Sequence, residues 1–429
     1  MLLIYTPKVT PRIIYVFKHI CTHTLGLNLK FTTKIEEFIA HEGEKFSYGR
    51  KRLGNELFVQ NVDLLLEQGL NDLEIKVQPW EDTKCFFAVS EKSDLPFDIF
   101  AASFFLLSRY EEYLPHVKDD FGRFPSSESL AYKKGFLKQP VVDIWAYKFK
   151  RVLKDRFENI KFRTRSYETV SIISVSHVFN FKNKGFLRSL SGTVLDLINL
   201  KFSRVSDRFR VLLRLKKDPY NVFDELIHFI KEYKTQMVFM FQLSDYNAYD
   251  KNINYNRQNY SSIIKYVADY SKVGLRLGYF AVQEEEVLKR EKKRFENIIH
   301  GPLQNVINPK YNLMLPLHYG YLNDLEIPND YSMGFPESIG FRAGTGTSFL
   351  FYDINMEVTT PLTIHPYVFH TQVCHTGNVV DIENTLDVLI SELKKVDGTF
   401  RAVFKNRDFS EYSNPAYFYS LLKQINEIQ

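Results

Sequence analysis

The run Ser171-Ile-Ile-Ser-Val-Ser-His177, followed by Val-Phe-Asn-Phe-Lys-Asn-Lys-Gly185, indicates the fold of the second half of this chain. Its first residues are mostly apolar and β-branched, which is typical of a short buried strand. Ser174, Ser176 and His177 stand at the end of that strand, before a loop rich in Lys and Asn. The run therefore predicts a buried strand that carries polar groups at its C-terminal end.

Similar apolar runs recur along the chain and alternate with helical patterns. We predict strands at 171–175, 237–243, 273–279, 338–342, 362–366 and 400–404, and helices at 219–233, 261–271, 284–299 and 382–395. This alternation predicts a mostly parallel sheet, either open or closed into a barrel. In a barrel the functional groups lie at the C-terminal ends of the strands, because the loops that follow them build the site.

The N-terminal part has its own pattern of elements. We predict strands at 2–5 and 28–32, strand-like alternation at 34–40, and helices at 11–24, 98–113 and 139–148. Residues 156–169 are charged and lack apolar periodicity, which is typical of a linker. The predicted organisation is an N-terminal α/β domain at 1–155, a linker at 156–169 and a second α/β domain at 170–429.

The composition is that of an ordinary globular protein. The chain has 429 residues, of which 45% are hydrophobic and 25% charged, enough for two or three domains. Its three cysteines, Cys21, Cys85 and Cys374, form no paired pattern, which fits free thiols in a reducing compartment. Without a signal-peptide pattern or a run approaching eighteen apolar residues, we predict a cytoplasmic protein with no membrane span.

The net charge of +5 is mild for this length, and no nucleic-acid-binding module is recognisable. Basic residues are densest at 182–217, where Lys and Arg alternate with apolar residues. Two interpretations are open. The stretch is either a solvated helix face, which we favour, or a surface for phosphates or an anionic membrane.

Motifs in both halves support a family resemblance. They lie at 54–58, 80–87, 98–113, 120–124 and 139–148, and at 245–252, 330–334, 340–345, 351–353 and 362–366. The last of these, Leu362-Thr-Ile-His-Pro366, is the most specific. On these motifs the chain resembles the NodB-like polysaccharide deacetylases, of the kind found in Bacteroidetes behind a long N-terminal domain. The resemblance implies a distorted (β/α) barrel at 170–429 and, in intact members, a zinc-activated water that removes acetyl groups from sugars.

The resemblance also shows where this chain departs from the family. Ser174 stands at the position of the catalytic base and Ser176 at that of a metal-binding Asp, and serine hydroxyls serve poorly in both roles. Arg276 takes the place of a ligand His, and its permanent positive charge cannot bind a cation. Pro309 and Lys405 stand at further changed positions. His365 matches the general acid of the family.

Binding candidates at the predicted strand ends are Arg276, Arg342, Asp245 and His177. If both arginines line the old pocket, a cationic cleft replaces the metal cleft and suits an anionic sugar, a phosphate or a carboxylate.

Structural roles stay open for the same residues. Arg276 could pair with one of residues 284–286, and Arg342 with a buried carboxylate such as Asp353. Asp245 could form a turn, and His365 could be a hydrogen-bonded structural histidine. An alternative metal site at His365, His370 and His375 is a weak hypothesis, because a spacing of five residues places them on no common helix or strand face.

Three functions follow as hypotheses. The first is a deacetylase-like pseudoenzyme without a cofactor, which binds a carbohydrate or a partner in cell-surface polysaccharide metabolism. The second is an active zinc-dependent hydrolase that removes N- or O-acetyl groups, with a site built from His177, Asp245 and His365. The third is a structural scaffold that binds a protein.

Overall fold

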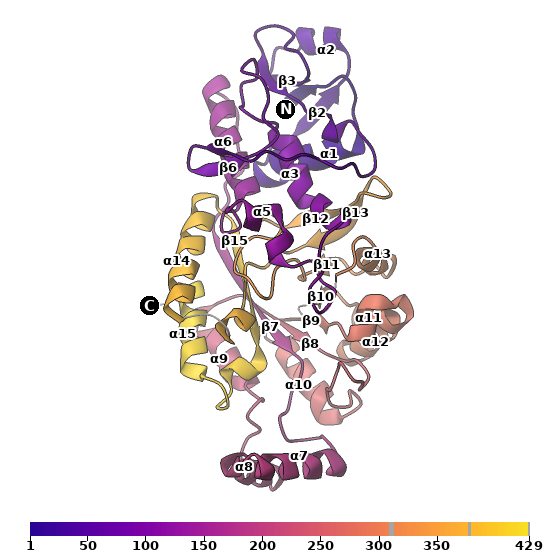
Figure 1. Ribbon diagram of the computed structural model, residues 1–429, viewed down its shortest axis with the longest axis vertical. Helices are drawn as coiled ribbons and strands as arrows, with labels where there is room; N and C mark the ends of the chain where they lie inside the picture. Colours follow the sequence, from indigo (N-terminus) through magenta and orange to yellow (C-terminus); the bar gives the residue numbers. More distant parts are fainter. Residues whose placement is uncertain (309–312, 376–378, 428–429) are drawn as a thin grey trace. The chain divides into compact units, whose positions relative to one another are not determined.

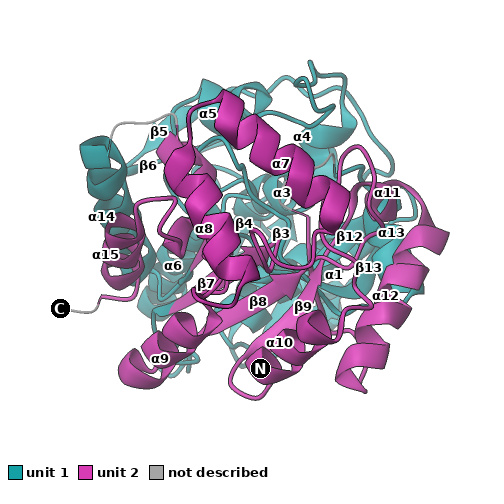
Figure 2. Cartoon of the chain, turned by 90° about the horizontal axis from the view of Figure 1, so that it is seen from below, with its two compact units in different colours: residues 1–168, 312–369, 376–400 teal, residues 169–311, 370–375, 401–429 magenta. Residues whose placement is uncertain are grey.

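The computed structural model describes residues 1–308, 313–375 and 379–427 (Figure 1). The chain forms two compact units (Figure 2). Unit 1 comprises residues 1–168, 312–369 and 376–400, and unit 2 comprises residues 169–311, 370–375 and 401–429. The N-terminal region therefore packs with two later segments of the chain.

A four-stranded parallel sheet organises the N-terminal part of unit 1. Its order is β2 (Leu29–Thr32), β1 (Leu2–Tyr5), β3 (Lys45–Gly49) and β4 (Leu57–Gln60). The strand predicted at 2–5 is confirmed. Residues 34–40 form a helix, α2 (Ile35–Ala40), so the predicted alternation was wrong there. Two glutamates in the first turn of α2 favour the helix, because acidic groups stabilise a helix N-terminus.

The helix predicted at 98–113 is present but divided. It begins after Asp98, whose carboxylate accepts hydrogen bonds from the N–H groups of Phe100 (3.1 Å) and Ala101 (3.0 Å). The helix α3 (Ile99–Leu107) is buried along its whole length. Arg109 has a φ of 55°, a left-handed conformation that ends α3 before the short helix α4 (Tyr110–Tyr113).

The other elements of unit 1 complete its layers. They are α1 (Pro11–Phe17), the π-helical turn η1 (Lys18–Thr24), η2 (Asp63–Leu65), β5 (Gln78–Trp80), β6 (Thr83–Cys85), η3 (Ser126–Glu128), α5 (Leu130–Lys133), α6 (Val141–Arg156), α13 (Leu317–Asp324), β11 (Asn329–Asp330), β12 (Phe349–Asp353), β13 (Val358–Ile364) and α14 (Val379–Lys395).

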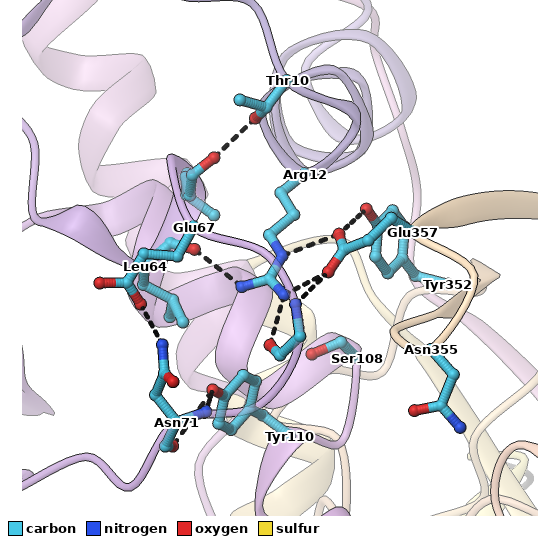
Figure 3. A network of polar contacts seen from close by, with 12 residues as sticks. Thr10, Arg12, Leu64, Glu67, Asn71, Ser108, Tyr110, Tyr352, Asn355 and Glu357 are labelled. Atoms are coloured by element: carbon cyan, nitrogen blue, oxygen red, sulfur yellow. Dashed lines mark hydrogen bonds and ion pairs between the residues drawn. The ribbon is translucent and has the colours of Figure 1, made fainter.

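A buried network joins α1 to the turn between β12 and β13 (Figure 3). The Arg12 guanidinium donates through Nε to Glu357 Oε2 at 2.9 Å and through Nη1 to Leu64 O at 2.9 Å, and it also pairs with Glu357 Oε1. Glu357 accepts a further hydrogen bond from the Tyr352 hydroxyl at 2.7 Å. Segments more than 280 residues apart in the sequence are thereby held together within unit 1.

Five neighbouring strands form the centre of unit 2. Their order is β10 (Asn305–Ile307), β9 (Lys272–Arg276), β8 (Met237–Phe241), β7 (Glu168–Val175) and β15 (Thr399–Lys405). The register shows that β7, β8, β9 and β10 run parallel. The other elements are α7 (Phe186–Ile198), α8 (Phe202–Leu212), α9 (Phe223–Tyr233), α10 (Gln258–Ala268), α11 (Tyr279–Gln283), α12 (Glu285–Ile299), η4 (Thr371–His375), η5 (Asn406–Phe409) and α15 (Pro415–Ile425). The short strand β14 (Phe369–His370) has one residue assigned to each unit.

Most of the predicted strands and helices of the second half are confirmed within a few residues. The strand predicted at 338–342 was wrong, because this segment is a loop in which Gly340 has a φ of 146°. The strand predicted at 273–279 ends at Arg276, since Tyr279 already begins α11. The result is a mixed α/β fold with parallel strands, and barrel closure stays a prediction.

In the part of the chain that the structure describes, no helix combines the length and the apolar character needed to cross a bilayer.

Candidate functional site

Polar side chains gather where β7, β8 and β9 end. The register places Ser174 opposite Met240, and Met240 opposite Gly274. Because side chains alternate between the faces of a strand, Gln242 and Arg276, each two residues further on, lie on the same face as Ser174. Parallel strands present their C-terminal ends at one edge of the sheet. Unit 2 therefore brings Ser174 and Arg276 together, at the edge where the sequence places a site.

Arg276 is buried and fills this position with its guanidinium. Its Nε donates to Ser174 Oγ at 3.1 Å and its Nη1 donates to Gln242 Oε1 at 2.5 Å. A fixed positive charge therefore lies against the serine that replaces the expected Asp.

Zinc does not fit the residues present here. It would need deprotonated Cys, neutral His or carboxylate ligands, and this position offers a serine hydroxyl, an amide and a guanidinium. Within residues 1–308, 313–375 and 379–427, no group of three or more His, Cys, Asp or Glu side chains could hold a metal ion.

The network continues from Gln242 into the loop that follows β8. Gln242 Nε2 donates to Ser244 Oγ at 2.9 Å and to Asp250 Oδ1 at 2.6 Å. The other oxygen of Asp250 accepts a hydrogen bond from the backbone N–H of Tyr279 at 2.6 Å. Because Asp250 is joined both to the loop after β8 and to the start of α11, it fixes the two loops that border Arg276.

A second carboxyl group, Glu291 on α12, lies buried beside this loop. It accepts a hydrogen bond from the N–H of Gly278 at 3.2 Å. Burial raises the pKa of Glu291 to about 8, and the nearby Asp250 adds to the rise. Gly278 has no room for a side chain, because a Cβ would lie 2.5 Å from Ser244 Cβ and 2.6 Å from Glu291 Oε1.

Cationic side chains border the same edge of unit 2. Asn406, directly after β15, donates through Nδ2 to His177 O at 2.8 Å and to Tyr220 O at 3.1 Å. This bond ties the end of β15 to the end of β7 and thus brings the segment of Lys405 and Arg407 to the segment of His177. We call Lys184, Arg276, Lys405 and Arg407 the cationic edge, and His177 lies beside it.

The protonation of these groups reflects their crowding. Burial, and then the charges of Lys184, Arg276 and Arg407, lower the pKa of His177 to about 4. Burial lowers the pKa of Lys405 to about 8, and the charge of Arg407 adds to the effect. Burial also lowers the pKa of Lys184 to about 8, although Asp218 opposes the change. Burial is the largest cause of each shift, and neighbouring positive charges add to it at His177 and Lys405.

Two carboxylates beside the cationic edge, Asp218 and Asp408, accept hydrogen bonds from the backbone. Asp218 accepts hydrogen bonds from the N–H groups of Asn180 (2.7 Å), Phe181 (2.9 Å) and Lys182 (3.0 Å). Asp408 accepts hydrogen bonds from the N–H of Lys405 at 2.8 Å and from the Thr371 hydroxyl at 2.6 Å. Both carboxylates thus stabilise loops, and they also partly balance the charges of Lys184 and Lys405.

Ser176 and His177 lie together at the end of β7, where His177 Nδ1 is 3.0 Å from Ser176 Oγ. Asp245 has a different place. It is exposed, and its Oδ2 accepts a hydrogen bond from Arg294 Nη2 at 2.9 Å. Its neighbour in the loop, Asp250, is the carboxylate that bonds to Gln242.

Arg342 and His365 belong to unit 1. Arg342 forms a buried ion pair with Glu112, at 2.8 Å and 2.6 Å, and not with Asp353 as the sequence suggested. Burial alone would raise the pKa of Glu112, but the charges of Arg342 and Arg109 outweigh it and hold the pKa at about 2. The charge of Arg342 is therefore balanced by Glu112 within unit 1.

Both ring nitrogens of His365 have hydrogen-bond partners. Nδ1 is 2.8 Å from Ser348 Oγ and Nε2 is 2.9 Å from Asn329 Oδ1. The imidazole also stacks on Tyr331, with ring centroids 4.5 Å apart. These contacts join His365 to Asn329, Tyr331 and Ser348 within unit 1.

Gln242, Asp250 and Glu291 were absent from the sequence prediction. One signal could have found Gln242: it follows five apolar residues of β8 and shares its strand face with the core, where polar side chains are rare. Asp250 and Glu291 lie beyond the strand ends, and their place depends on how a loop and a helix fold back. Pro309 lies outside the described residues.

The family model that matches this chain covers only its N-terminal part. Residues 2–158 match the model of a family of unknown function, DUF7033. No curated protein matches the chain.

The similar solved structures include polysaccharide deacetylases at low sequence identity. A protein from Mycobacterium smegmatis, assigned as a polysaccharide deacetylase, shares 9% identity over 61% of this chain and 85% of its own, with a TM-score of 0.37. A polysaccharide deacetylase from Bacillus cereus shares 10% identity over 62% and 88%, with a TM-score of 0.31. A mutant of a CE4-family pseudoenzyme with restored activity shares 7% identity over 61% and 63%, with a TM-score of 0.31. At these TM-scores the likenesses are too distant to assign the fold.

Proposed function

We propose that unit 2 carries an anion-binding site in place of the metal-dependent hydrolytic site of the deacetylases that its sequence resembles. The proposed ligand is an acidic carbohydrate, recognised through a carboxylate or a phosphate. The observation that carries this proposal is the buried Arg276, bonded to Ser174 and Gln242 at the edge where β7, β8 and β9 end. On this proposal the protein is a pseudoenzyme, and the sequence resemblance suggests a distorted barrel and a role in cell-surface polysaccharide metabolism.

The chemistry of the cationic edge supports binding over hydrolysis. Guanidinium and ammonium groups recognise carboxylates and phosphates through charge-assisted hydrogen bonds. Hydrolysis would need a base at Ser174, which instead accepts a hydrogen bond from a cation. The alternative hydrolase built on His177, Asp245 and His365 finds less support, since Asp245 pairs with Arg294 and both His365 nitrogens have partners.

The first test measures binding of defined oligosaccharides by calorimetry. We expect an oligosaccharide that contains glucuronate to bind and a neutral N-acetylglucosamine oligomer of equal length not to bind. Lys405→Met keeps the length of the side chain and removes its charge, and we expect it to weaken binding by about tenfold or more. Lys76→Met serves as the matched control, because it makes the same change at an exposed lysine of unit 1 that pairs with Glu74.

The second test addresses the loss of hydrolysis. Purified protein is analysed for metal and for release of acetate from N-acetylated oligosaccharides. Stoichiometric zinc, together with turnover that His365→Ala abolishes, would overturn the pseudoenzyme proposal. Equal binding of acidic and neutral oligosaccharides would overturn the anion site, even if no turnover were found.

A further inference from the structure

Two helices of unit 2 carry an exposed apolar surface. They are α7 (Phe186–Ile198) and α8 (Phe202–Leu212), which contact each other and are joined by a three-residue connection (Figures 1 and 2). Leu187 is 80% exposed and Phe186 is 79% exposed. We call residues 186–215 the helical hairpin. Its exposed apolar side chains are Phe186, Leu187, Leu190, Val194, Leu195, Leu197, Ile198, Leu200, Phe202, Phe209, Leu212, Leu213 and Leu215.

Charged residues occupy the seam between these two helices. Arg208 is only 7% exposed and Asp196 only 8%, and they form an ion pair. Arg208 Nη1 also donates to Thr193 Oγ1 at 2.7 Å and to Ser189 O at 3.0 Å. A helix pair surrounded by water normally places its apolar stripe inside and its charges outside. In the helical hairpin, by contrast, an ion pair is buried between the helices while many large apolar side chains are exposed.

The exposed apolar residues form continuous stripes. With about 100° of rotation per residue, the side chains of residues 186, 187, 190, 194, 197 and 198 on α7 fall within an arc of about 120°. On α8 and just after it, residues 202, 209, 212 and 213 fall within an arc of about 100°. Stripes of this width are typical of helices that lie on an apolar surface.

The charge of this region singles it out from the rest of the chain. Residues 182–217 contain ten Lys and Arg and two Asp, a net charge of +8, whereas the whole chain has +5, so the remaining residues sum to −3. Both acidic groups are paired, Asp196 with Arg208 and Asp207 with Lys216 at 2.8 Å. Arg210 and Arg214 are exposed beside the apolar stripe of α8.

We propose that the helical hairpin docks the protein on an anionic lipid surface, with its apolar stripes at the level of the acyl chains and its basic residues at the headgroups. An anionic bilayer has an apolar interior for the exposed apolar stripes and negatively charged headgroups for the basic residues. It therefore accounts for both features of the hairpin. The helices have 13 and 11 residues, which suits a position in the plane of the interface. This proposal is independent of the proposed carbohydrate site.

The test is co-sedimentation of the full chain with lipid vesicles. The probes are vesicles of phosphatidylcholine alone and vesicles with roughly 30 mol% phosphatidylglycerol. We expect binding to the anionic vesicles to exceed binding to the neutral ones by about tenfold or more, and to fall when salt is raised from about 0.1 M to about 0.5 M.

Two variants separate the apolar and electrostatic contributions. Leu187→Ser, Leu190→Ser and Phe209→Ser together should abolish sedimentation, and Arg210→Gln with Arg214→Gln should remove the preference for anionic lipid. The matched control, Ile39→Ser with Met356→Ser, removes exposed apolar side chains in unit 1 and should sediment as the unmodified chain does. Because all these residues are exposed, the unfolding temperature of each variant should match that of the unmodified chain.

Three results would overturn the proposal. The first is equal binding to neutral and anionic vesicles. The second is unchanged sedimentation of the triple serine variant. The third is light scattering that shows a dimer, lost in the triple serine variant, in a protein that binds no vesicles, because the apolar surface would then be covered by a second copy of the chain.

Discussion

At the scale of single residues, Arg276 explains why replacing Ser174 alone by Asp, the residue of the family that the sequence resembles, should not create a metal site. A carboxylate at position 174 would lie about where the serine hydroxyl accepts the bond from Arg276 Nε, and would form an ion pair with it. We therefore expect Ser174→Asp alone to bind no zinc in an equilibrium titration. Ser174→Asp and Ser176→Asp with Arg276→His should bind it measurably, because the cation is replaced by a ligand.

The control for this experiment is Ser174→Asn with Ser176→Asn and Arg276→His, which keeps the shape of the new site without its carboxylates. Zinc binding by the single Ser174→Asp variant would contradict the role given to Arg276. It would show that the guanidinium moves aside at little cost.

Glu291 gives a second prediction at this scale, a pH dependence of stability. Its pKa is about 8 in the folded protein and about 4.3 in an unfolded chain. Between these values the folded state holds a proton that the unfolded state releases, so the free energy of unfolding falls as the pH rises through this window. Glu291→Gln removes the titrating group, and we expect urea titrations at pH 5 and pH 9 to show a smaller loss than in the unmodified chain.

The matched control for Glu291 is Glu286→Gln on the same helix. Glu286 is exposed and pairs with Lys289, so its removal should leave the pH dependence unchanged. If Glu291→Gln and Glu286→Gln gave the same pH profile, a buried proton on Glu291 would be ruled out.

The sequence predicts part of the candidate site at this scale. Strand ends and alternation are local properties, so Ser174, His177 and Arg276 could be placed at one edge before the structure was known. The partner of Arg342 could not be placed, because Glu112 lies 230 residues away in the sequence. Glu112 lies in the run Tyr110-Glu-Glu-Tyr113, which has the composition of an exposed segment. No local pattern shows that this glutamate is buried and binds an arginine.

At the scale of elements, Asp98 makes the start of α3 depend on one carboxylate. It accepts hydrogen bonds from two N–H groups of α3, from the Tyr48 hydroxyl at 2.8 Å and from the N–H of Val62 at 2.8 Å. Asp98→Ala would leave these buried donors unpaired, and we expect a loss of about 2 kcal/mol or more in the free energy of unfolding. Asp98→Asn keeps an oxygen acceptor and should lose less. Equal losses in chemical denaturation would contradict this account of the cap.

Short elements were where the sequence prediction failed. A segment of six or seven residues, such as 34–40, covers fewer than two helical turns, so its apolar pattern fits a strand and a helix equally well. Contacts decide between them. Glu37 of α2 accepts hydrogen bonds from Lys30 Nζ and Thr32 Oγ1, both at 2.6 Å, which fold the segment back on β2.

At the scale of the whole molecule, the division into units does not follow the order of the chain. Strand and helix patterns identify elements, but they carry no information on which distant segment will complete a given core. Unit 1 takes up residues 312–369 and 376–400, while the family model matched at the N-terminus ends at residue 158. The N-terminal region should therefore depend for its stability on residues far outside that match.

Arg12 and Glu357 allow this dependence to be measured. Arg12 is buried, and its charge is balanced by a carboxylate from the turn between β12 and β13 (Figure 3). Glu357→Gln leaves the guanidinium buried without a balancing charge, which costs roughly 3–5 kcal/mol when an ion pair is buried. We expect that loss in urea denaturation of the full chain. The double variant Arg12→Met with Glu357→Gln should recover part of it, because no unpaired charge remains. The single variant Arg12→Met completes the comparison. If the double variant lost as much free energy of unfolding as the two single variants combined, the two residues would act independently. The pair would then not join the N-terminal region to residues 312–369.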